Sequence, residues 1–417
     1  MTKNLKHFLI LSLIGISVFG QVVNETNPPD YIKSITIKGN TPESQLPIIR
    51  LGEDIVLEFD ALNGNEDDFY YKIEHFNYDW TPSRLSKVEY LQGFDNQRIV
   101  NYENSFNSYQ IYSHYKLRIP NNQTRRLLKT GNYMISIYDD YDEMVFSRKF
   151  MVYQEQANVG VAIKRSRDVR HINQKQSVDI SISPRNFNFN NPKQTVKALI
   201  IQNNNLNTAI SGLEPLYTVG NELIYRYDVE SSFWAGNEYL FLDTKDPRVA
   251  NAATRYIDLK DLYHNYLYAD LVRATRAYTY NPDINGNFVI TAIDADDPSI
   301  EADYIWVHFY LDHPEFLDDK NIHIYGNFNN YLVEEATKMT YSEESGFFEG
   351  KMLLKQGFYN YKYVEVDSEG NLDEGAISGN FDQTENNYKV LVYYRDLGGR
   401  YDEIIGVGEG SSINISN

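Results

Sequence analysis

The sequence predicts an all-β protein made of β-sandwich domains in tandem. Its 417 residues include 35 Tyr and 21 Phe, and aromatic side chains, like β-branched ones, are enriched in strands. Short alternating apolar runs recur along the whole chain, and Gly, Asn and Asp turns separate them, which is typical of strands joined by tight connections. One sandwich takes about 100 residues, so this length indicates several domains.

The first domain is predicted over residues 21–155. Strand-like runs cover residues 31–38, 55–59, 69–78, 109–119, 131–138 and 144–153. Turn-forming residues stand between them at 63–65 (NGN) and 139–142 (DDYD), and the pattern breaks at 79–82 (DWTP). About seven short strands in roughly 125 residues are typical of an immunoglobulin-like sandwich.

A central β domain is predicted over residues 156–300, after a polar linker at 154–159. Its strands are expected at residues 178–182, 196–202, 223–229, 239–243, 268–278 and 287–292. Residues 250–260 fit a short helix or a loop. The acidic stretch 294–301 (DADDPSIE) marks the next boundary, because clustered Asp and Pro favour connections over strands. The apolar run at 306–311 either completes this domain or begins the next one.

The third domain is predicted over residues 301–417. Its runs are 322–331 (IHIYGNFNNY), 339–341 (MTY), 354–364 (LKQGFYNYKYV) and 392–406, which are dense in Tyr, Phe and Val. They resemble the early-set sandwich of glycogen-binding modules, which hold sugar on exposed Trp rings. Because Tyr331 stands where such modules usually have Trp, we expect the scaffold without its sugar platform, and glycan binding is kept as an alternative function. Trp80 and Trp234 stand beside turn residues and are expected to fill cores.

Residues 1–20 have the features of a secretory signal peptide. Lys3 and Lys6 give the positive start, residues 8–19 (FLILSLIGISVF) give the apolar core, and cleavage is expected near Gly20–Gln21. The alternative is an uncleaved anchor, but this core is too short to span a bilayer. No cysteine follows it to carry a lipid, and no later apolar run is long enough for a membrane span. The mature chain is therefore expected in the periplasm.

Charge and cysteine content exclude several classes of partner and site. The chain has no cysteine, which excludes disulfides and thiolate-based metal sites. Its net charge is −19, and from Ile300 onward 22 acidic residues face 8 basic ones. Nucleic acid and anionic lipid are therefore poor partners. The acidity either keeps an exported domain soluble or forms a face that binds a basic rim on a partner.

No residue set is predicted to be catalytic, to bind a cofactor or to hold a metal. The carboxylates at 139–143 and at 367–374 are interpreted as hairpin turns rather than calcium loops. His308, His313 and His323 lack the convergent spacing of a zinc site. No nucleophile motif, zinc-protease motif or phosphate loop is present. An enzyme is not expected; a deep pocket with convergent carboxylates or His would be needed to identify one.

An ordered series of motifs resembles a known family. The motifs are 78–83 (YDWTPS), 90–94 (YLQGF), 112–115 (YSHY), 131–133 (GNY), 201–203 (IQN), 233–238 (FWAGNE), 302–304 (ADY), 354–357 (LKQG) and 393–395 (YYR). In this order and spacing they resemble the plug protein of the type IX secretion system of Bacteroidota, over about residues 22–410.

The resemblance implies a non-catalytic periplasmic protein. Such a plug occupies the periplasmic opening of the outer-membrane β-barrel translocon, whose lumen would otherwise leak, and leaves when a cargo-bound shuttle engages the lateral gate of the barrel. The partner implied is that barrel, with no nucleic acid and no membrane insertion of the plug itself. Loops at one end of a sandwich are expected to make the contact.

Overall fold

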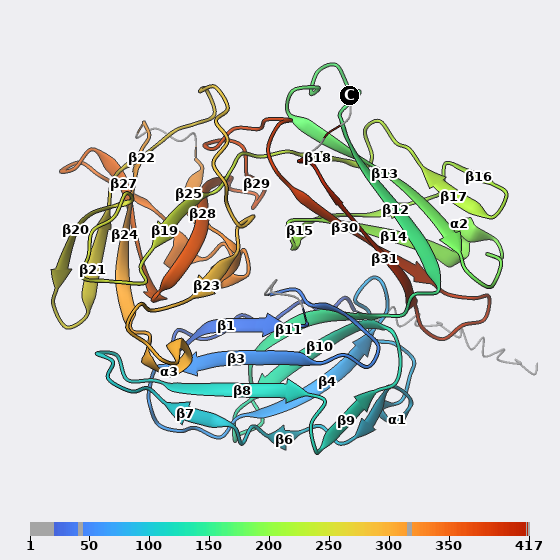
Figure 1. Cartoon of the computed structure of the whole chain (residues 1–417), viewed down its shortest axis with the longest axis horizontal. Coiled ribbons are helices and arrows are strands. Elements are labelled where there is room, and N and C mark those ends of the chain that lie inside the picture. Colours follow the sequence, from blue (N-terminus) through green and yellow to red (C-terminus); the bar gives the residue numbers. More distant parts are fainter. Residues whose placement is uncertain (1–20, 41–44, 315–318, 414, 416–417) are drawn as a thin grey trace, which may run out of the picture.

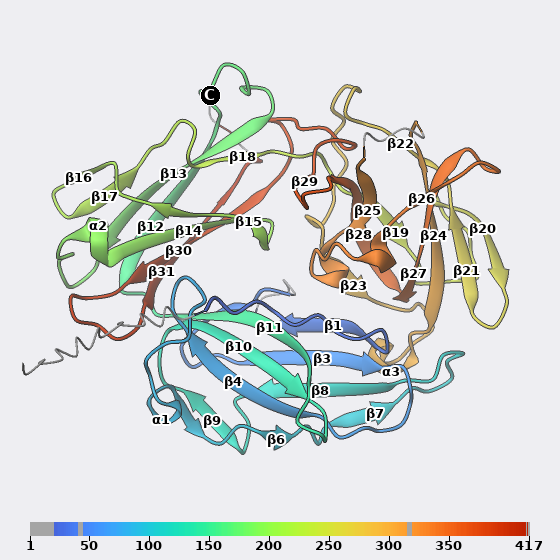
Figure 2. The same ribbon diagram turned by 180° about the vertical axis from the view of Figure 1, so that it is seen from behind.

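A computed structural model describes residues 21–40, 45–314, 319–413 and 415, and the predicted signal segment lies outside them. Nearly all regular elements are strands, which confirms the all-β prediction. Three two-sheet units lie side by side around a triangle, and both views show each unit next to the other two (Figures 1 and 2). Within the described ranges, no helix reaches the length and apolarity that a bilayer crossing requires.

The first unit packs a four-stranded sheet on a five-stranded one. The first sheet has the order β1 (Ile32–Lys38), β3 (Ile55–Ala61), β8 (Ser113–Ile119), β7 (Tyr102–Asn104), and the second has the order β2 (Ile48–Arg50), β11 (Met144–Tyr153), β10 (Gly131–Tyr138), β4 (Tyr70–Phe76), β6 (Gln97–Arg98). Aromatic rings fill the space between them: Phe59 stacks on Tyr115 with centroids 5.1 Å apart and meets Phe146 edge-on. β5 (Leu91–Gly93), which follows α1 (Lys87–Tyr90), pairs with β9 (Thr124–Leu127) in a separate two-stranded sheet.

The second unit joins strands from the middle of the chain with strands from its end. One sheet contains β12 (Ala157–Arg165), β13 (Lys175–Pro184), β17 (Glu222–Tyr225), β16 (Tyr217–Val219) and β18 (Ser232–Trp234). The other has the order β15 (Asn205–Leu213), β14 (Val196–Gln202), β30 (Asn387–Tyr394), β31 (Glu403–Ser411), and α2 (Pro192–Thr195) precedes β14. A Cβ at Gly408 would lie 2.7 Å from the carbonyl oxygen of Val159, so glycine permits the close approach of β31 to β12.

The third unit lies between β18 and β30 in the sequence. One sheet contains β19 (Leu240–Asp243), β28 (Gly357–Val366) and β23 (Phe288–Ile290), with β25 (Asn321–Tyr325) and β29 (Leu372–Asp373) also on β28. The other has the order β20 (Thr254–Leu259), β21 (Tyr263–Leu267), β24 (Tyr304–Asp312), β27 (Phe347–Lys355), β26 (Thr340–Ser342), with β22 (Asp270–Leu271) on β24. The connections include α3 (Pro298–Glu301), η1 (Asn327–Asn329) and η2 (Glu335–Thr337).

This topology corrects the division into 156–300 and 301–417. Seven residue pairs from Val196↔Tyr394 to Gln202↔Tyr388 join β14 to β30, so the end of the chain belongs to the second unit and the third unit is inserted into it. Alternation of side chains predicts a strand but not which distant strand it pairs with, and the contiguous division was therefore wrong in this respect.

Three local predictions also need correction. Residues 250–260 contain the strand β20, which pairs with β21, rather than a helix or loop. Only Asp270–Leu271 is a strand within 268–278. The predicted linker at 154–159 already includes the start of β12. In each case the presence or absence of a neighbouring strand to pair with determined the local structure, which the residue pattern of the segment alone did not predict.

Candidate functional site

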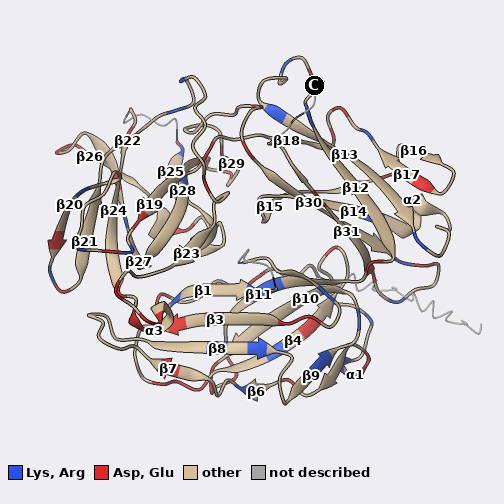
Figure 3. Ribbon diagram, viewed as in Figure 1, with Lys and Arg blue, Asp and Glu red and all other residues tan. Residues whose placement is uncertain are grey.

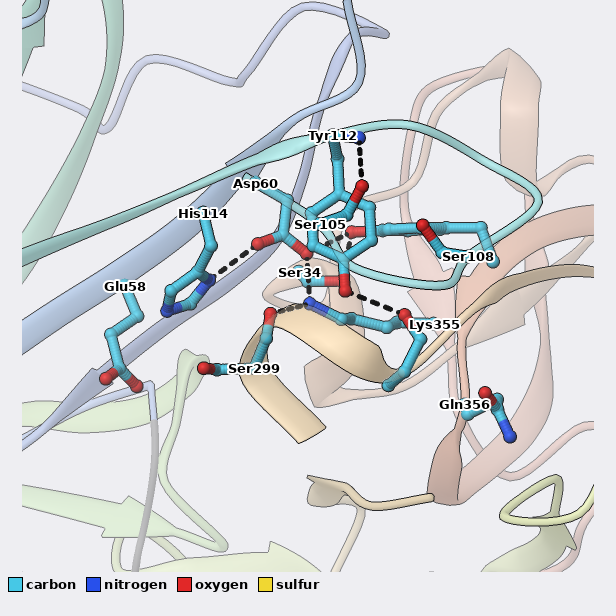
Figure 4. A network of polar contacts seen from close by, with 12 residues as sticks. Ser34, Glu58, Asp60, Ser105, Ser108, Tyr112, His114, Ser299, Lys355 and Gln356 are labelled. Atoms are coloured by element: carbon cyan, nitrogen blue, oxygen red, sulfur yellow. Dashed lines mark hydrogen bonds and ion pairs between the residues drawn. The ribbon is translucent and has the colours of Figure 1, made fainter. Parts of the chain in front are cut away.

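A buried polar network joins the first unit to the third, and this contact is termed the first junction (Figure 4). Asp60 on β3 lies at its centre. Its Oδ2 accepts hydrogen bonds from Lys355 Nζ at 2.6 Å and from the Tyr304 hydroxyl at 2.7 Å, and its Oδ1 lies 2.7 Å from His114 Nδ1. The side chains of Asp60 and Lys355 are 0% and 2% exposed. The two units are thus joined by an ion pair out of contact with water.

The local sequence explains how these groups meet. Asp60 pairs with His114 across β3 and β8, on the sheet face that the third unit covers. A bulge in β1 places Ser34 at φ 52°, with its hydroxyl 2.7 Å from that of Tyr304. Burial by itself would raise the pKa of Asp60, but Lys355 and His114 beside it hold that pKa below its ordinary value. Asp60 is therefore a carboxylate in the folded protein.

A loop of the first unit extends this junction along α3. The carboxylate of Asp303 accepts hydrogen bonds from the backbone N–H groups of Tyr109 at 3.0 Å and Gln110 at 3.2 Å. The hydroxyl of Tyr112 donates to the carbonyl of Ala302 at 2.8 Å. These contacts fix the loop between β7 and β8 against the start of β24.

The second junction joins the first unit to the second. Asp402 accepts from the guanidinium of Arg395 at 2.7 Å and from the backbone N–H of Tyr78 at 3.0 Å. The hydroxyl of Tyr393 donates to the buried Asn132 at 2.7 Å. Apolar side chains from both units complete the contact: Leu46, Met151, Leu199, Ile201, Leu391, Tyr393 and Ile404. The apolar cluster makes this junction resemble a core more than a wet surface contact.

His75 lies at the second junction and makes stability depend on pH. Its ring packs against Tyr133 and Tyr401, Nε2 donates to the carbonyl of Thr130 at 3.0 Å, and buried Nδ1 has no partner among the described residues. Burial lowers the pKa of His75 to about 4 from 6.5. As the pH falls, His75 is therefore protonated in the unfolded chain before it is protonated in the folded protein. This difference is expected to reduce the free energy of unfolding by about 2 kcal/mol between pH 7 and pH 5.

This expectation is checked by urea unfolding at pH 7 and pH 5. The variant His75→Gln should lose less stability over that interval than the wild type, because glutamine takes up no proton. An equal loss in both proteins would assign the pH dependence to other groups, such as His308, whose pKa burial also lowers to about 4.

The third junction joins the second unit to the third. Asn205 Nδ2 donates to the hydroxyl of Tyr325 at 3.0 Å, and the hydroxyl of Tyr331 donates to the carbonyl of Asn203 at 3.3 Å. A further contact joins the first unit to the third: the side chain of Glu25, which precedes β1, accepts from Asn330 at 2.5 Å and from the backbone of Lys149 at 2.5 Å. Every pair of units is therefore in contact.

Tyr331, Trp80 and Trp234, the aromatic residues that the sequence analysis compared with a sugar platform, have different surroundings. Tyr331 is 3% exposed, so its ring has no free face for a sugar. Trp80 is partly buried beside the apolar cluster of the second junction. Trp234 is 48% exposed, which corrects the expectation that it fills a core, and the ammonium of Lys175 lies 4.3 Å from the centre of its ring.

The carboxylate clusters are hairpin and turn residues. Asp139 Oδ1 accepts from the backbone N–H groups of Tyr141 and Glu143 between β10 and β11. Asp367 Oδ1 accepts from those of Glu369 and Asn371 between β28 and β29. Both sets therefore stabilise turns, as predicted.

The three histidines singled out in the sequence have separate partners. His308 lies 2.8 Å from His264 and stacks on Tyr266. His323 lies 3.0 Å from the hydroxyl of Thr337, and His313 lies 3.9 Å from Glu365. Within the described part of the chain, no His, Asp and Glu side chains gather in the manner of a metal site.

The joining role of these residues was missed in the sequence, although several of them stand in the motifs 112–115, 302–304, 354–357 and 393–395. Asp60 follows the run IVLEF and Lys355 follows LL, so both are charges at the ends of apolar strands. A charge placed there is a weak signal of a buried partner, because strand ends usually face water.

Comparisons with known proteins give a family and a whole-chain relative. Residues 32–154 match the family described as "Type 9 secretion system plug protein 1st domain", which spans the first unit. A hypothetical protein from Parabacteroides merdae, known from a crystal structure, is 32% identical with a TM-score of 0.89; the match covers 94% of this chain and 100% of that one. The comparison with curated proteins gives no match.

Proposed function

Because the chain belongs to the family of type 9 secretion system plug proteins, we propose that it binds and closes the periplasmic opening of the outer-membrane β-barrel translocon of that system. It would act there without catalysis, as an exported protein held at the outer membrane by its partner. The family match over residues 32–154 is the observation that carries this proposal.

The arrangement of the three units suits an obstructing role. A plug must keep its shape against an opening, and here three junctions tie each unit to the other two through buried contacts such as Asp60–Lys355 and Tyr393–Asn132. The sandwiches lie side by side, so they present a broad body rather than a thin rod (Figure 1). A body of this kind obstructs an opening by its shape, with no need for a reactive site.

Charge on the surface fits a contact that can be released. Lys and Arg as well as Asp and Glu are distributed over all three units (Figure 3). A polar interface with complementary charges binds specifically and still dissociates, whereas a large apolar one tends to be permanent. The net charge of −19 favours a basic rim on the partner.

Exposed apolar side chains on the first unit support a contact with the barrel on that unit. Val88, Phe94 and Val100 are 79%, 69% and 78% exposed and are termed the outer rim. They belong to α1 and to the connections that follow β5 and β6; β6 and β7 lie on the side of the first unit away from the other two (Figure 2), whereas Glu89 of α1 forms an ion pair with Arg400 of the second unit. Large exposed apolar side chains often mark a contact with another protein, and the rim lies within the matched family domain.

Affinity purification of a tagged chain from native envelopes tests the function and the contact together. The wild type is expected to bring down the translocon barrel. Replacing Val88, Phe94 and Val100 by serine should reduce the recovered barrel by about tenfold or more, since central apolar contacts each contribute on the order of 1–2 kcal/mol. A matched control replaces Val169, Val229 and Val249, which are exposed on the other units.

The outcomes separate the two claims. No barrel with the wild type, together with an unchanged permeability of the outer membrane in a deletion strain, would refute the sealing role. Full recovery of the barrel with the outer-rim variant would refute only the choice of surface. The glycan alternative has no support from Tyr331, whose buried ring contacts the second unit.

A further inference from the structure

A cavity of about 480 Å³ lies between β1 of the first unit and β27 of the third. Its size falls within the usual range of small-molecule sites, about 300–1,000 Å³. Much of the lining is apolar and comes from both units: Ile32, Ile35, Phe288, Phe328, Met352 and Leu354. The bulge at Ser34 borders it. Among the described strands, β24 alone pairs with β27 over residues 350–355, so the cavity lies between two strand edges.

A buried arginine without a carboxylate partner reaches this cavity. Arg148 on β11 has the same strand alternation as the core residues Phe146 and Phe150, so it starts inside the first sandwich. It is 3% exposed and lines the cavity. Of its three guanidinium nitrogens, only Nη1 has a hydrogen-bond partner among the described residues, the carbonyl of Ser147 at 2.8 Å.

An arginine buried in this way is stabilised by an anion beside it. Arginine keeps its charge in proteins, and a buried cation without compensation costs several kcal/mol. Burial lowers the pKa of Arg148, while Glu25 raises it only through space. Both carboxylate oxygens of Glu25 are engaged elsewhere, one by the backbone of Lys149 and one by Asn330.

The other charges around the cavity favour the same sign of ligand. Lys33 and Lys351 also line it, and within the described ranges neither forms an ion pair. Lys355 is already paired with Asp60. Two carboxylates, Asp30 and Glu334, belong to the lining, but Asp30 is exposed and Glu334 caps the short helix η2.

We propose that this cavity binds an amphipathic anion of the fatty-acid class. The planar guanidinium of Arg148 matches a carboxylate with two parallel hydrogen bonds, which a point charge does not provide. The apolar lining then covers the hydrocarbon chain of the ligand. This inference does not rest on the proposed function, because the cavity lies between units and away from the outer rim.

Calorimetric titration of the full mature chain, stripped of lipid, tests the proposal with dodecanoate as the probe. We expect one molecule to bind per chain. Dodecanol, which has the same chain without the charge, should bind at least about tenfold more weakly, because hydrogen bonds to charged groups contribute on the order of 1.5–3 kcal/mol. Dodecyl phosphate serves as a second probe: tighter binding than dodecanoate would assign a phospholipid-type head in place of a carboxylate.

Three variants decide whether the cavity is the site. Arg148→Met should weaken dodecanoate by about tenfold or more and leave dodecanol unchanged. Ala336→Trp, at an exposed position on the lining, should block both probes, and it tests the site even if the Arg148 variant does not fold. Arg126→Met, on the exposed side of β9, is the matched control and should bind as the wild type does. No binding by the wild type, or binding that neither Arg148→Met nor Ala336→Trp alters, would overturn the proposal.

Discussion

Replacing Asp60 by alanine is expected to reduce the free energy of unfolding by about 3–5 kcal/mol, because it leaves a buried ammonium without its counter-ion. Lys355 is 2% exposed, and its remaining hydrogen bond goes to the carbonyl of Ser299. Tyr304 and His114 lose the same acceptor. The effect is measured by urea unfolding at pH 7, followed by tyrosine fluorescence, and by the release of the first unit in limited proteolysis.

Two comparisons make this result specific. Asp54→Ala breaks the exposed ion pair with Arg118 and should cost at most about 1 kcal/mol. The double variant Asp60→Ala with Lys355→Met removes both charges and should be more stable than Asp60→Ala alone, since no buried ammonium remains. Should the single variant unfold like the wild type, the first junction would be no more than a surface contact.

In a chain truncated after Glu385, the remaining part of the second unit is expected to be unfolded. The truncation removes β30 and β31, so β14 loses one of its two neighbouring strands along its whole length and the sandwich loses half of one sheet. Buried core residues such as Tyr388 and Val390 are removed with them. We expect proteases to cleave within residues 157–234 of the truncated chain and to leave that region intact in the full chain.

The matched control removes a much longer piece. Replacing residues 237–380 by a short Gly/Ser linker deletes the inserted third unit but keeps β30 and β31. The ends to be joined are close, because the N–H of Phe381 donates to the carbonyl of Gly236 at 2.8 Å. The second unit is expected to stay folded in this variant. If residues 157–234 stayed protected from proteases in the chain that ends at Glu385, β30 and β31 would not be needed to keep the second unit folded, and the prediction would be wrong.

Strands with a strong local pattern were predictable to the residue. The bounds of β10, β11 and β14 are the same as those expected from sequence, because their alternation or continuous apolar run reflects burial within one sheet. The hairpin turn at Asp139 was equally clear, since Asp there serves the backbone. The ordered motifs also indicated the family that the comparison with family models matched over the first unit.

Long-range organisation was not predictable in the same way. Asp60 and Lys355 are 295 residues apart, and neither position has a feature that points to the other. The same holds for β14 and β30, which look like ordinary strands of two separate domains. From the sequence alone, Arg148 would be predicted to lie on the surface of an edge strand, whereas it is buried on the core-facing side of β11. Such features depend on which sheet faces cover each other, and that information is not contained in local periodicity.

The insertion of the third unit also sets the order in which a new chain can complete itself. Strand β14 precedes the inserted third unit and β30 follows it, so the edge of β14 remains open until β30 has reached it. An unpaired edge is where wrong pairing and aggregation begin, and pairing between distant segments is slow. A folding chain is therefore most vulnerable to aggregation before β30 and β31 have paired with the rest of the second unit.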